Sequence, residues 1–453
     1  MAPRRPPSGH AGIFCGPGAI MSRIWTTQLP AHIGQRAQLA GWLHHWRRLS
    51  RVSFLVLRDG RGVAQVVVED PAVSRRLDGL HRESLLSIDG IVQANPHAPG
   101  GVEVHDAAIE VVVPTTGSPA LDLSRPTLRA SPSFVLDHAP VALRNPRLRA
   151  RFEIASASMF GFRTTLRSLD FAEVQTPKIV SAATESGASV FSIDYFGRQA
   201  YLAQSPQLYK QIMVGVFERV FEIGPVFRAE PHDTPRHLNE YVSMDAEMGF
   251  IADHFTIMDI LTKVLGGMVE AIRKDAATSL AVLDLSPPDI PATVPTLHFS
   301  EALELISRET GERVQDEMDL APIHERWLGR WAQATHGSDY LFVVGYPMAR
   351  RPFYTHPDPA RPRYSNSFDL LFRGTELVSG GQRLHRYEDY ISALRTGGLS
   401  PDPVAGYLEA FQCGMPPHGG FAIGLERWVA SLVSASNIRE VTLFPRDRQR
   451  VSP

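Results

Sequence analysis

Five short runs of alternating and β-branched residues lie between about residue 36 and residue 113, and they constrain the fold more than any other feature. The first three are AQLAGWLHHWRRL, VSFLVLRDG and GVAQVVVED, and the turn at Asp59 and Gly60 separates the second from the third. The last two are LLSIDGIVQAN and VEVHDAAIEVVV. Alternation of this kind is typical of half-buried strands, and five strands in roughly 80 residues favour a small barrel of the OB type. We predict that barrel over residues 21–114.

The segments that flank this predicted barrel have a different composition. Residues 1–20 are rich in Pro, Gly and Arg and lack the apolar run of a secretory signal, so we expect a disordered extension there. Residues 115–149 are rich in Pro, Ser and Arg and are predicted to form a linker.

From Ala150 onward, helical spacing replaces the alternation. RFEIASASMFGFRTTLRSLD has apolar residues at helical intervals, and strand-like runs return at LFVVGYP, NSFDLLF and GTELVSGG. We predict an α+β domain over residues 150–453, in which helices flank a sheet and residues 252–340 form a mostly helical insertion.

The composition excludes several classes of protein. No window of about 18 apolar residues occurs, so we expect no membrane span. Cys15 and Cys413 lie far apart and form neither a metal-ligand spacing nor a disulfide framework, which fits a reducing, cytoplasmic location. The net charge of -2 neither indicates nor excludes a nucleic-acid partner. Lysine is rare in this chain, which makes Lys210 conspicuous.

Charged residues recur on one face of two strand-like runs in VFEIGPVFRAEPHDTPRHLNEYVSMDAEMGF, residues 220–250. Arg228 and Glu230 are two residues apart, as are Asp245 and Glu247, and residues i and i+2 of a strand point the same way. These pairs are typical of a binding site, although a hairpin with surface ion pairs would show the same pattern.

Two further segments have the composition of a ligand site. In PPHGGFAIGLERWVASL, glycines precede a helix with Arg427 in its first turn, where an anion would be favoured. In SFDLLFRGTELVSGGQRLHRYED, Asp369 and Glu376 on neighbouring strands could hold Mg²⁺. A tight connection and unrelated strand-end charges are the respective alternatives.

Taken together, these segments resemble a known family. FRAE on the first strand of a hairpin, followed by G-x-E-R at a helix start, is similar to motifs 2 and 3 of class II aminoacyl-tRNA synthetases, and the strand around Pro177 is similar to motif 1. A preceding OB barrel narrows the resemblance to the aspartate, asparagine and lysine subgroup. The segments ESGASVF, LAQSPQLYKQ, RHLNEY and SGGQR resemble the archaeal and eukaryotic form of aspartyl-tRNA synthetase.

This resemblance implies a class II catalytic domain with an antiparallel sheet, and a reaction in which ATP activates L-aspartate for transfer to tRNA(Asp). It also implies Mg²⁺ and a homodimer formed through the strand around Pro177. The catalytic residues implied are Arg228, Glu230 and Arg427. The ATP-binding residues implied are Arg228, Glu230, Arg236, His237, Tyr241, Glu376, Gly424 and Arg427, with Tyr241 and Arg427 on either side of the adenine. The metal ligands implied are Asp369, Glu376 and Ser379.

Substrate choice follows from positive charge, because aspartate differs from asparagine by one carboxylate. The resemblance assigns that carboxylate to Lys210 and Arg383, whereas asparagine enzymes of the subgroup usually lack the lysine. The full set implied for aspartate is Glu185, Gln204, Gln207, Lys210, Arg228, Asp245, Ser379 and Arg383.

In the barrel, Phe54 and Gln65 match residues that stack on and hydrogen-bond the anticodon, unless Phe54 is a core residue. Relatives restricted to tRNA(Asp) tend to have Trp and Lys where this chain has His44 and Pro99. The resemblance therefore implies a non-discriminating enzyme that also charges tRNA(Asn). Ala422 stands where close relatives usually have glycine.

Four alternatives remain open at the level of sequence. They are a discriminating enzyme, a paralogue that makes an amide on free aspartate, a noncatalytic RNA-binding or regulatory paralogue with a specialised role, and an asparagine enzyme. Relatives of the second kind lack the barrel, and the third predicts loss of motif residues that this chain retains.

Overall fold

The structure is a computed structural model that describes residues 23–49, 52–181 and 189–452. The chain divides into two units, Met1–Asn145 and Pro146–Pro453. The predicted extension at residues 1–20 and the predicted substrate contact Glu185 lie outside the described residues.

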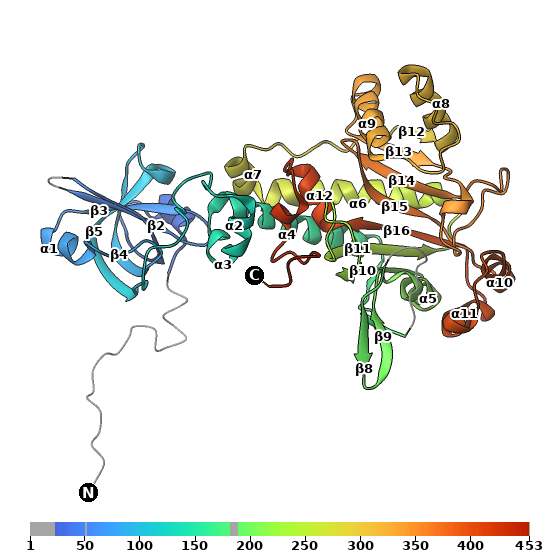
Figure 1. Ribbon diagram of the computed structural model, residues 1–453. Coiled ribbons are helices and arrows are strands. Elements are labelled where there is room, and N and C mark those ends of the chain that lie inside the picture. Colours follow the sequence, from blue (N-terminus) through green and yellow to red (C-terminus); the bar gives the residue numbers. More distant parts are fainter. Residues whose placement is uncertain (1–22, 50–51, 182–188, 453) are drawn as a thin grey trace, which may run out of the picture. The chain divides into compact units, whose positions relative to one another are not determined.

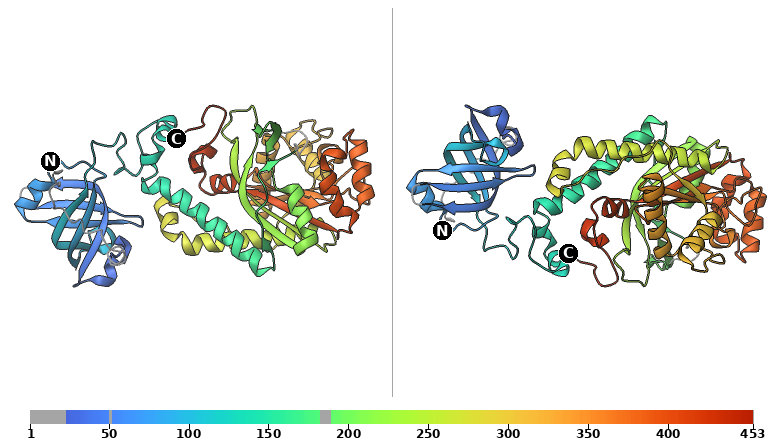
Figure 2. Two further views of the ribbon diagram at one scale, coloured as in Figure 1. Left: turned by 90° about the horizontal axis from the view of Figure 1, so that it is seen from below. Right: turned by 90° about the horizontal axis from the view of Figure 1, so that it is seen from above.

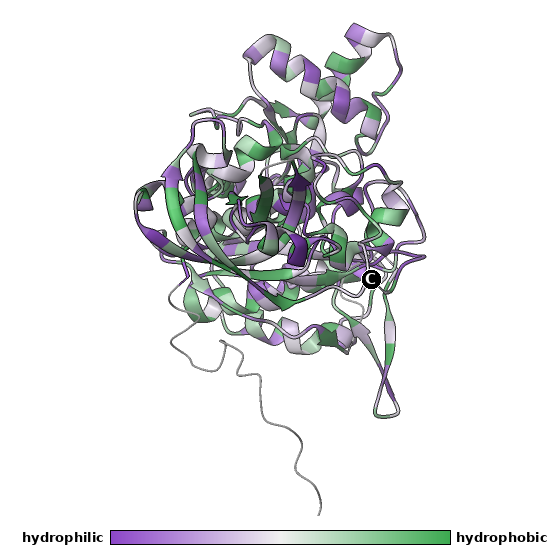
Figure 3. Cartoon of the chain, turned by 90° about the vertical axis from the view of Figure 1, so that its left-hand side faces the viewer, coloured by the Kyte–Doolittle hydropathy of each residue, from purple (hydrophilic) through white to green (hydrophobic). Residues whose placement is uncertain are grey.

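The first unit contains a closed barrel with strand order β1-β2-β3-β5-β4, which confirms the predicted OB-type fold (Figure 1). Hydrophobic and hydrophilic residues alternate along its strands, and the apolar ones form the core (Figure 3). Its elements are β1 (Arg36–Arg48), β2 (Ser53–Arg58), β3 (Val63–Val68), α1 (Pro71–Leu77), β4 (Leu85–Ala94) and β5 (Val102–Val113).

Closure of the barrel depends on β1, which pairs with β4 through its first half and with β2 through its second. The change of partner occurs around Gly41 and Trp42. A Cβ at Gly41 would lie 2.4 Å from the carbonyl oxygen of Arg58, so only glycine lets the strands approach this closely. A bulge between Leu43 and His45 follows and bends the strand further.

The segment predicted to be a linker contains two short helices, α2 (Pro132–Asp137) and α3 (Ala139–Ala142). Ser131 accepts a hydrogen bond from the Phe134 amide and caps α2, and Pro132 occupies the first helical turn. Serine and proline at these positions are start signals for a helix as well as loop residues, and this explains why composition indicated only a linker.

An eight-stranded sheet organises the second unit, with order β12-β13-β14-β15-β16-β11-β10-β6. Its pairs are antiparallel except at the edges, where β12 pairs with β13 and β6 with β10 in parallel. A second, three-stranded sheet has the order β7-β9-β8. The strands are β6 (Ala172–Glu173), β7 (Ile179–Val180), β8 (Ser192–Tyr195), β9 (Arg198–Leu202), β10 (Arg219–Phe227), β11 (Glu240–Gly249), β12 (Thr296–His298), β13 (Tyr340–Val344), β14 (Ser367–Phe372), β15 (Thr375–Gln382) and β16 (His418–Gly424).

Helices pack on this sheet, and the long pair α4 and α6 lies side by side along it (Figure 2). The stretch predicted as a mostly helical insertion contains α6 to α9, while β12 adds to the sheet edge. The helices are α4 (Pro146–Ser168), α5 (Gln207–Phe217), α6 (His254–Asp275), α7 (Ala277–Leu283), α8 (Phe299–Thr310), α9 (Pro322–His336), α10 (Tyr387–Thr396), α11 (Ala405–Gln412) and α12 (Leu425–Leu432). Among the described residues, no helix has the length and apolar character needed to cross a bilayer.

The contact between α4 and α6 gives a test of this packing. A Cβ at Gly161 of α4 would lie 2.6 Å from the Gly267 carbonyl oxygen and 2.6 Å from the Met268 Cα, both in α6. We expect Gly161→Ala to lower the free energy of unfolding of the second unit by about 1–3 kcal/mol in urea melts, because backbone atoms would have to move apart.

Gly406 of α11 provides the matched control, since a Cβ there would have no atom within 4 Å. We expect Gly406→Ala to leave stability unchanged or raise it by up to ~1 kcal/mol. Equal stability of the two variants would contradict the close approach of the two helices.

Candidate active site

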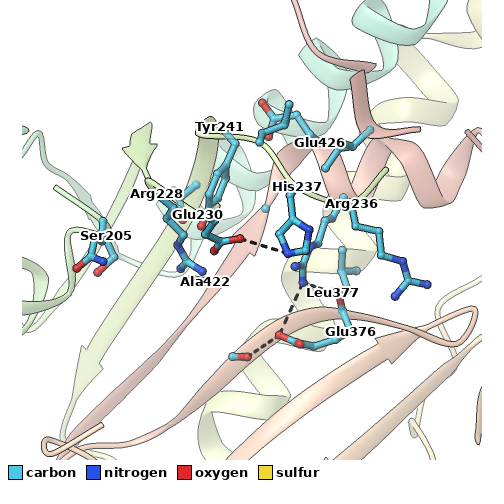
Figure 4. Close-up of a pocket in the computed structure, with 17 residues that line it drawn as sticks. Ser205, Arg228, Glu230, Arg236, His237, Tyr241, Glu376, Leu377, Ala422 and Glu426 are labelled. Atoms are coloured by element: carbon cyan, nitrogen blue, oxygen red, sulfur yellow. Dashed lines mark hydrogen bonds and ion pairs between the residues drawn. The ribbon is translucent and has the colours of Figure 1, made fainter. Parts of the chain in front are cut away.

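The hairpin of β10 and β11 forms one wall of a pocket on the sheet of the second unit (Figure 4). Arg228 follows β10, and Asn239 fixes this strand end by donating from its side chain to the Arg228 carbonyl oxygen at 2.7 Å. The guanidinium of Arg228 lies 5.5 Å from the centre of the Tyr241 ring. A cation and an aromatic face therefore meet at the pocket. The prediction that Arg228 and Glu230 lie on one face of a strand is wrong, because β10 ends at Phe227 and both residues belong to the loop that follows.

The opposite wall comes from β15, β16 and the start of α12. Arg427 donates to the main-chain oxygen of Glu376 at 3.2 Å. A Cβ at Gly424 would lie 3.9 Å from the Arg427 Cβ and 4.0 Å from the Tyr241 Cε2. Gly424 thus lies between Tyr241 and Arg427, and its missing side chain keeps the space between them open for a flat ligand.

The loop between β10 and β11 supplies a third group of polar side chains. His237 Nε2 lies 3.2 Å from Glu230 Oε2, and the Thr234 hydroxyl lies 2.6 Å from His237 Nδ1. Arg236 lies 4.0 Å from Glu325 of α9. The predicted residues that line this one pocket are Gln204, Arg228, Glu230, Arg236, His237, Tyr241, Glu376, Ser379, Gly424 and Arg427.

A buried cluster of four charges lies beside the pocket. Lys210 Nζ is 3.0 Å from Asp245 Oδ1 and 3.2 Å from Glu247 Oε2, and Arg383 Nε donates to Glu247 Oε1 at 3.0 Å. Their exposed fractions are 7% or less. The hydroxyl of Ser243, which lines the pocket, donates to Asp245 and connects the two regions. The predicted aspartate-binding residues Lys210, Asp245 and Arg383 therefore lie together.

Comparison with known proteins identifies the family. A model described as tRNA synthetases class II (D, K and N) matches residues 131–448, and one described as OB-fold nucleic acid binding domain matches residues 37–112. The chain belongs to the class II tRNA synthetases of the D, K and N group. The family resemblance of its motifs is thereby confirmed. The chain is an aminoacyl-tRNA synthetase, a ligase of a family that uses ATP, an amino acid and tRNA.

Individual relatives span nearly the whole chain. An Aspartate--tRNA(Asp/Asn) ligase of Thermus thermophilus is 45% identical over 431 residues, 95% of this chain and 100% of the relative. An enzyme of the same name from Deinococcus radiodurans is 43% identical over 438 residues, 96% of this chain and 99% of the relative. The asparaginyl-tRNA synthetase of Pyrococcus horikoshii, solved with asparaginyl-adenylate, has a TM-score of 0.87 and 30% identity, and covers 95% of this chain and 99% of that chain.

The synthetase site contains two acidic residues that the sequence motifs did not single out as ligand contacts. Glu247 is fully buried; burial opposes its ionisation, but Arg383 and Lys210 outweigh this and lower the pKa of its carboxyl. Its position two residues after Asp245 was the available signal. Glu426 lines the pocket that contains Tyr241 and Arg427, and it accepts a hydrogen bond from the Val242 amide at 3.1 Å.

The residues predicted to bind metal lie on paired strands. Asp369 faces Ser379 across β14 and β15, and Ser379 donates to Glu376 Oε1 at 3.0 Å. One Asp369 oxygen lies 3.1 Å from Arg351, and the other, Oδ1, is buried and has no hydrogen-bond partner among the described residues. Among those residues, no three His, Cys, Asp or Glu side chains gather as a metal cluster.

In the barrel, Phe54 and Gln65 lie on the outer surface. Their neighbours Leu55 and Val66 are fully buried, so alternation points Phe54 away from the core and excludes a core role for it. Gln65 donates to Glu103 at 2.8 Å. Phe54 and Gln65 belong to adjacent strands on one face.

The two residues predicted to govern tRNA choice lie apart in the barrel. His44 is half-buried at the bulge of β1, and burial lowers its pKa. Pro99 is exposed and begins the short 3-10 helix Pro99–Gly101 before β5.

The carboxyl of Glu426 gives the site a pH dependence. Burial raises its pKa from 4.5 to about 7. Between these values the folded protein keeps a proton that the unfolded chain releases, so the stabilisation is complete below pH 4.5 and is lost as the pH rises through about 7. We expect Glu426→Gln, which retains the acceptor for Val242, to become more stable than the parent as the pH rises, by up to about 3 kcal/mol.

Urea unfolding of both proteins at about pH 5 and about pH 8 measures this difference. Parallel stability curves across that interval would show that Glu426 ionises normally in the folded protein.

Proposed function

We propose that this synthetase is an aspartate–tRNA ligase that charges both tRNA(Asp) and tRNA(Asn). The observation that carries the amino-acid assignment is the pair of buried cations, Lys210 and Arg383, beside the ATP-side pocket. The names of the Thermus and Deinococcus relatives support it.

The fold alone does not choose between aspartate and asparagine, since an asparaginyl enzyme is among the similar structures. The charges do. Lys210 and Arg383 balance Asp245 and Glu247. Aspartate and asparagine both carry an α-carboxylate, which would be neutralised by Arg228 outside this cluster. Aspartate then adds an ammonium group and a side-chain carboxylate, which leaves the sum of charges in the cluster unchanged. Asparagine adds only the ammonium and leaves one buried positive charge unbalanced, which is costly in a dry site.

The ATP-side residues are suited to the activation step. Tyr241 and Arg427 would hold the adenine between them, and Glu230 would accept a hydrogen bond from the adenine amino group. Arg228 would neutralise the α-phosphate and the aspartate α-carboxylate, which suits the planar fork of its guanidinium. Arg236 and His237 would contact the outer phosphates.

The reaction then proceeds with little need for a protein base. An oxygen of the α-carboxylate attacks the α-phosphorus of ATP, the bond to the bridging oxygen breaks, and pyrophosphate leaves. A hydroxyl at the 3′ end of tRNA next attacks the carbonyl carbon of the aspartyl-adenylate, and AMP leaves. Both steps depend on positioning and charge neutralisation.

A magnesium ion would be held by Asp369, Glu376 and Ser379. The buried Asp369 Oδ1, for which the described residues provide no hydrogen-bond donor, fits a hard cation. Two carboxylates and a hydroxyl leave room for phosphate oxygens and water, which Mg²⁺ favours. The ion would supply charge neutralisation on the phosphates.

On the tRNA side, we propose that Phe54 stacks on an anticodon base and that Gln65 hydrogen-bonds one. His44 and Pro99 would admit tRNA(Asn) as well as tRNA(Asp). A homodimer through the strand around Pro177 is supported by the exposed apolar side chain of Ile179, two residues further on, which is 48% exposed. Work on tRNA suits a cytoplasmic enzyme.

The amino-acid assignment is tested by aspartate-dependent ATP–pyrophosphate exchange. We expect Lys210→Gln to lower kcat/KM for aspartate by at least about 100-fold, because a buried charge pair is lost, while the KM for ATP stays near that of the parent. Glutamine is preferable to leucine here, since an apolar residue would leave Asp245 and Glu247 without a hydrogen-bond donor at this position.

Lys263, exposed on α6, offers the matched control. Lys263→Gln should exchange like the parent. Absence of aspartate-dependent exchange in the parent would refute the aspartate assignment, and exchange with asparagine instead would reassign the enzyme. Exchange without any tRNA charging would favour the amide-forming alternative, whereas the noncatalytic alternative predicts no exchange at all.

Choice of the tRNA is tested with separate tRNA(Asp) and tRNA(Asn) transcripts. We expect the parent to charge both, and the double variant His44→Trp/Pro99→Lys to lose at least about tenfold more kcat/KM for tRNA(Asn) than for tRNA(Asp). ATP–pyrophosphate exchange should be unchanged, because both residues lie in the barrel. Charging of tRNA(Asp) alone by the parent would make the enzyme discriminating.

A further inference from the structure

A chain of buried, uncharged polar groups lies behind the proposed aspartate pocket. It runs from His418 at the start of β16 through Gln211 and Gln207 of α5 to Arg383, and each of these side chains is at most 7% exposed. These groups come from distant parts of the sequence and include two residues, Gln211 and His418, that have no role in the reaction described above.

Two carbonyl groups set the direction of the hydrogen bonds in this chain. The Tyr390 hydroxyl donates to the Leu384 carbonyl oxygen at 2.7 Å and so accepts from the Gln211 side-chain nitrogen at 3.0 Å, and the Pro416 carbonyl acts on His418 in the same sense. His418 Nδ1 lies 2.9 Å from the Pro416 carbonyl oxygen, which can only accept, so Nδ1 carries the proton. Burial lowers the pKa of His418 to about 4, and the ring is neutral at pH 7. Its Nε2 is then an acceptor, and the Gln211 side-chain nitrogen, 3.0 Å away, is the donor.

The orientation of Gln211 fixes that of Gln207. With its nitrogen toward His418, Gln211 presents its oxygen to Gln207, whose nitrogen donates to it at 3.0 Å. The Gln207 oxygen therefore faces Arg383 and accepts from Nη2 at 3.4 Å. Reversal of either amide would bring two donors together, which a buried site does not tolerate without cost.

Arg383 is held on three sides by this arrangement. Nε donates to Glu247, and Nη2 donates to the Gly420 carbonyl oxygen at 3.2 Å and to Gln207. The described residues provide no hydrogen-bond acceptor for Nη1. A planar guanidinium anchored through Nε and Nη2 can present Nη1 to a ligand in one orientation only.

We propose that Gln211 and His418 are positioning residues for amino-acid specificity. Through this one-directional chain they hold the Gln207 oxygen against Arg383 and so aim Arg383 at the side-chain carboxylate of the substrate. The inference rests on the proposed aspartate function. Both residues act through Gln207 and Arg383. Their effect is therefore on the selection of aspartate and not on the binding of ATP.

The test uses Gln211→Met, which has a similar shape and no hydrogen-bonding groups. With the chain broken, the Gln207 amide can turn and Arg383 is no longer fixed. We expect the KM for aspartate in ATP–pyrophosphate exchange to rise about tenfold, equivalent to one lost buried hydrogen bond, with the KM for ATP within about twofold of the parent. The preference for aspartate over asparagine should fall by a similar factor.

Tyr407→Phe is the matched control. The Tyr407 hydroxyl donates to the same Gln211 oxygen at 3.1 Å and is equally buried, but the chain from His418 to Arg383 does not pass through it. This variant should lose comparable stability and keep the aspartate KM and the amino-acid preference of the parent. A general loosening of the core would instead change both variants alike, and that result would overturn the proposal.

Gln211→Glu keeps the test decisive if the methionine variant does not fold. It retains an oxygen that accepts a hydrogen bond from the Gln207 side chain. We therefore expect its aspartate KM to stay within about tenfold of that of the parent, even where its free energy of unfolding falls. An unchanged preference for aspartate in a folded Gln211→Met protein, or an aspartate KM in Gln211→Glu raised more than tenfold, would refute the positioning role. If the parent itself shows no exchange with aspartate, the proposed function fails. If the parent is active and the folded variants behave like it, only the positioning role fails.

Discussion

The catalytic unit depends on four charges that are buried together on its sheet. Lys210, Asp245, Glu247 and Arg383 are each at most 7% exposed, and each charge has an opposite partner within 3.2 Å. Removal of one member of such a set typically costs about 3–5 kcal/mol, because the others remain buried and unpaired. Such a cluster is a weak source of stability, and its proposed role is that of a preorganised receptor for one more pair of opposite charges.

The neighbouring strand β16 shows how the fold leaves room for a ligand beside this cluster. From Gly420 onward, its residues alternate between small ones on the pocket side and large ones on the core side. A Cβ at Gly420 would lie 2.2 Å from Glu247 Oε2, while Phe421 and Ile423 are buried in the core cluster. Ala422 shares the pocket side with Gly420 and Gly424, so its methyl group takes space that a glycine would leave open. The glycine-rich run thus serves close approach of side chains and ligand.

Period-two alternation explains why much of the site could be predicted from sequence. It pairs Asp245 with Glu247 on one side of β11, and the same rule predicts the strands of the barrel. It fails for Arg228 and Glu230, because β10 ends at Phe227. The chain from His418 to Gln211 could not be predicted in this way, because its members are 207 residues apart and meet only through tertiary packing. Neutral glutamines and a histidine also have no charge pattern that would mark them as a site. The helices α2 and α3 were missed for another reason, since serine and proline begin helices and loops alike.

The two selections that such an enzyme makes have different physical settings. We propose that choice of the amino acid takes place in a dry cluster, where one unbalanced charge is expensive and no member can change alone. The proposed choice of the tRNA depends on two residues of the barrel, His44, which is half-buried, and Pro99, which is exposed. Substitution there disturbs little else, and surface contacts are worth less because water competes for them. Aspartate enzymes of this family can therefore differ in the number of tRNAs that they charge while they keep the same amino acid.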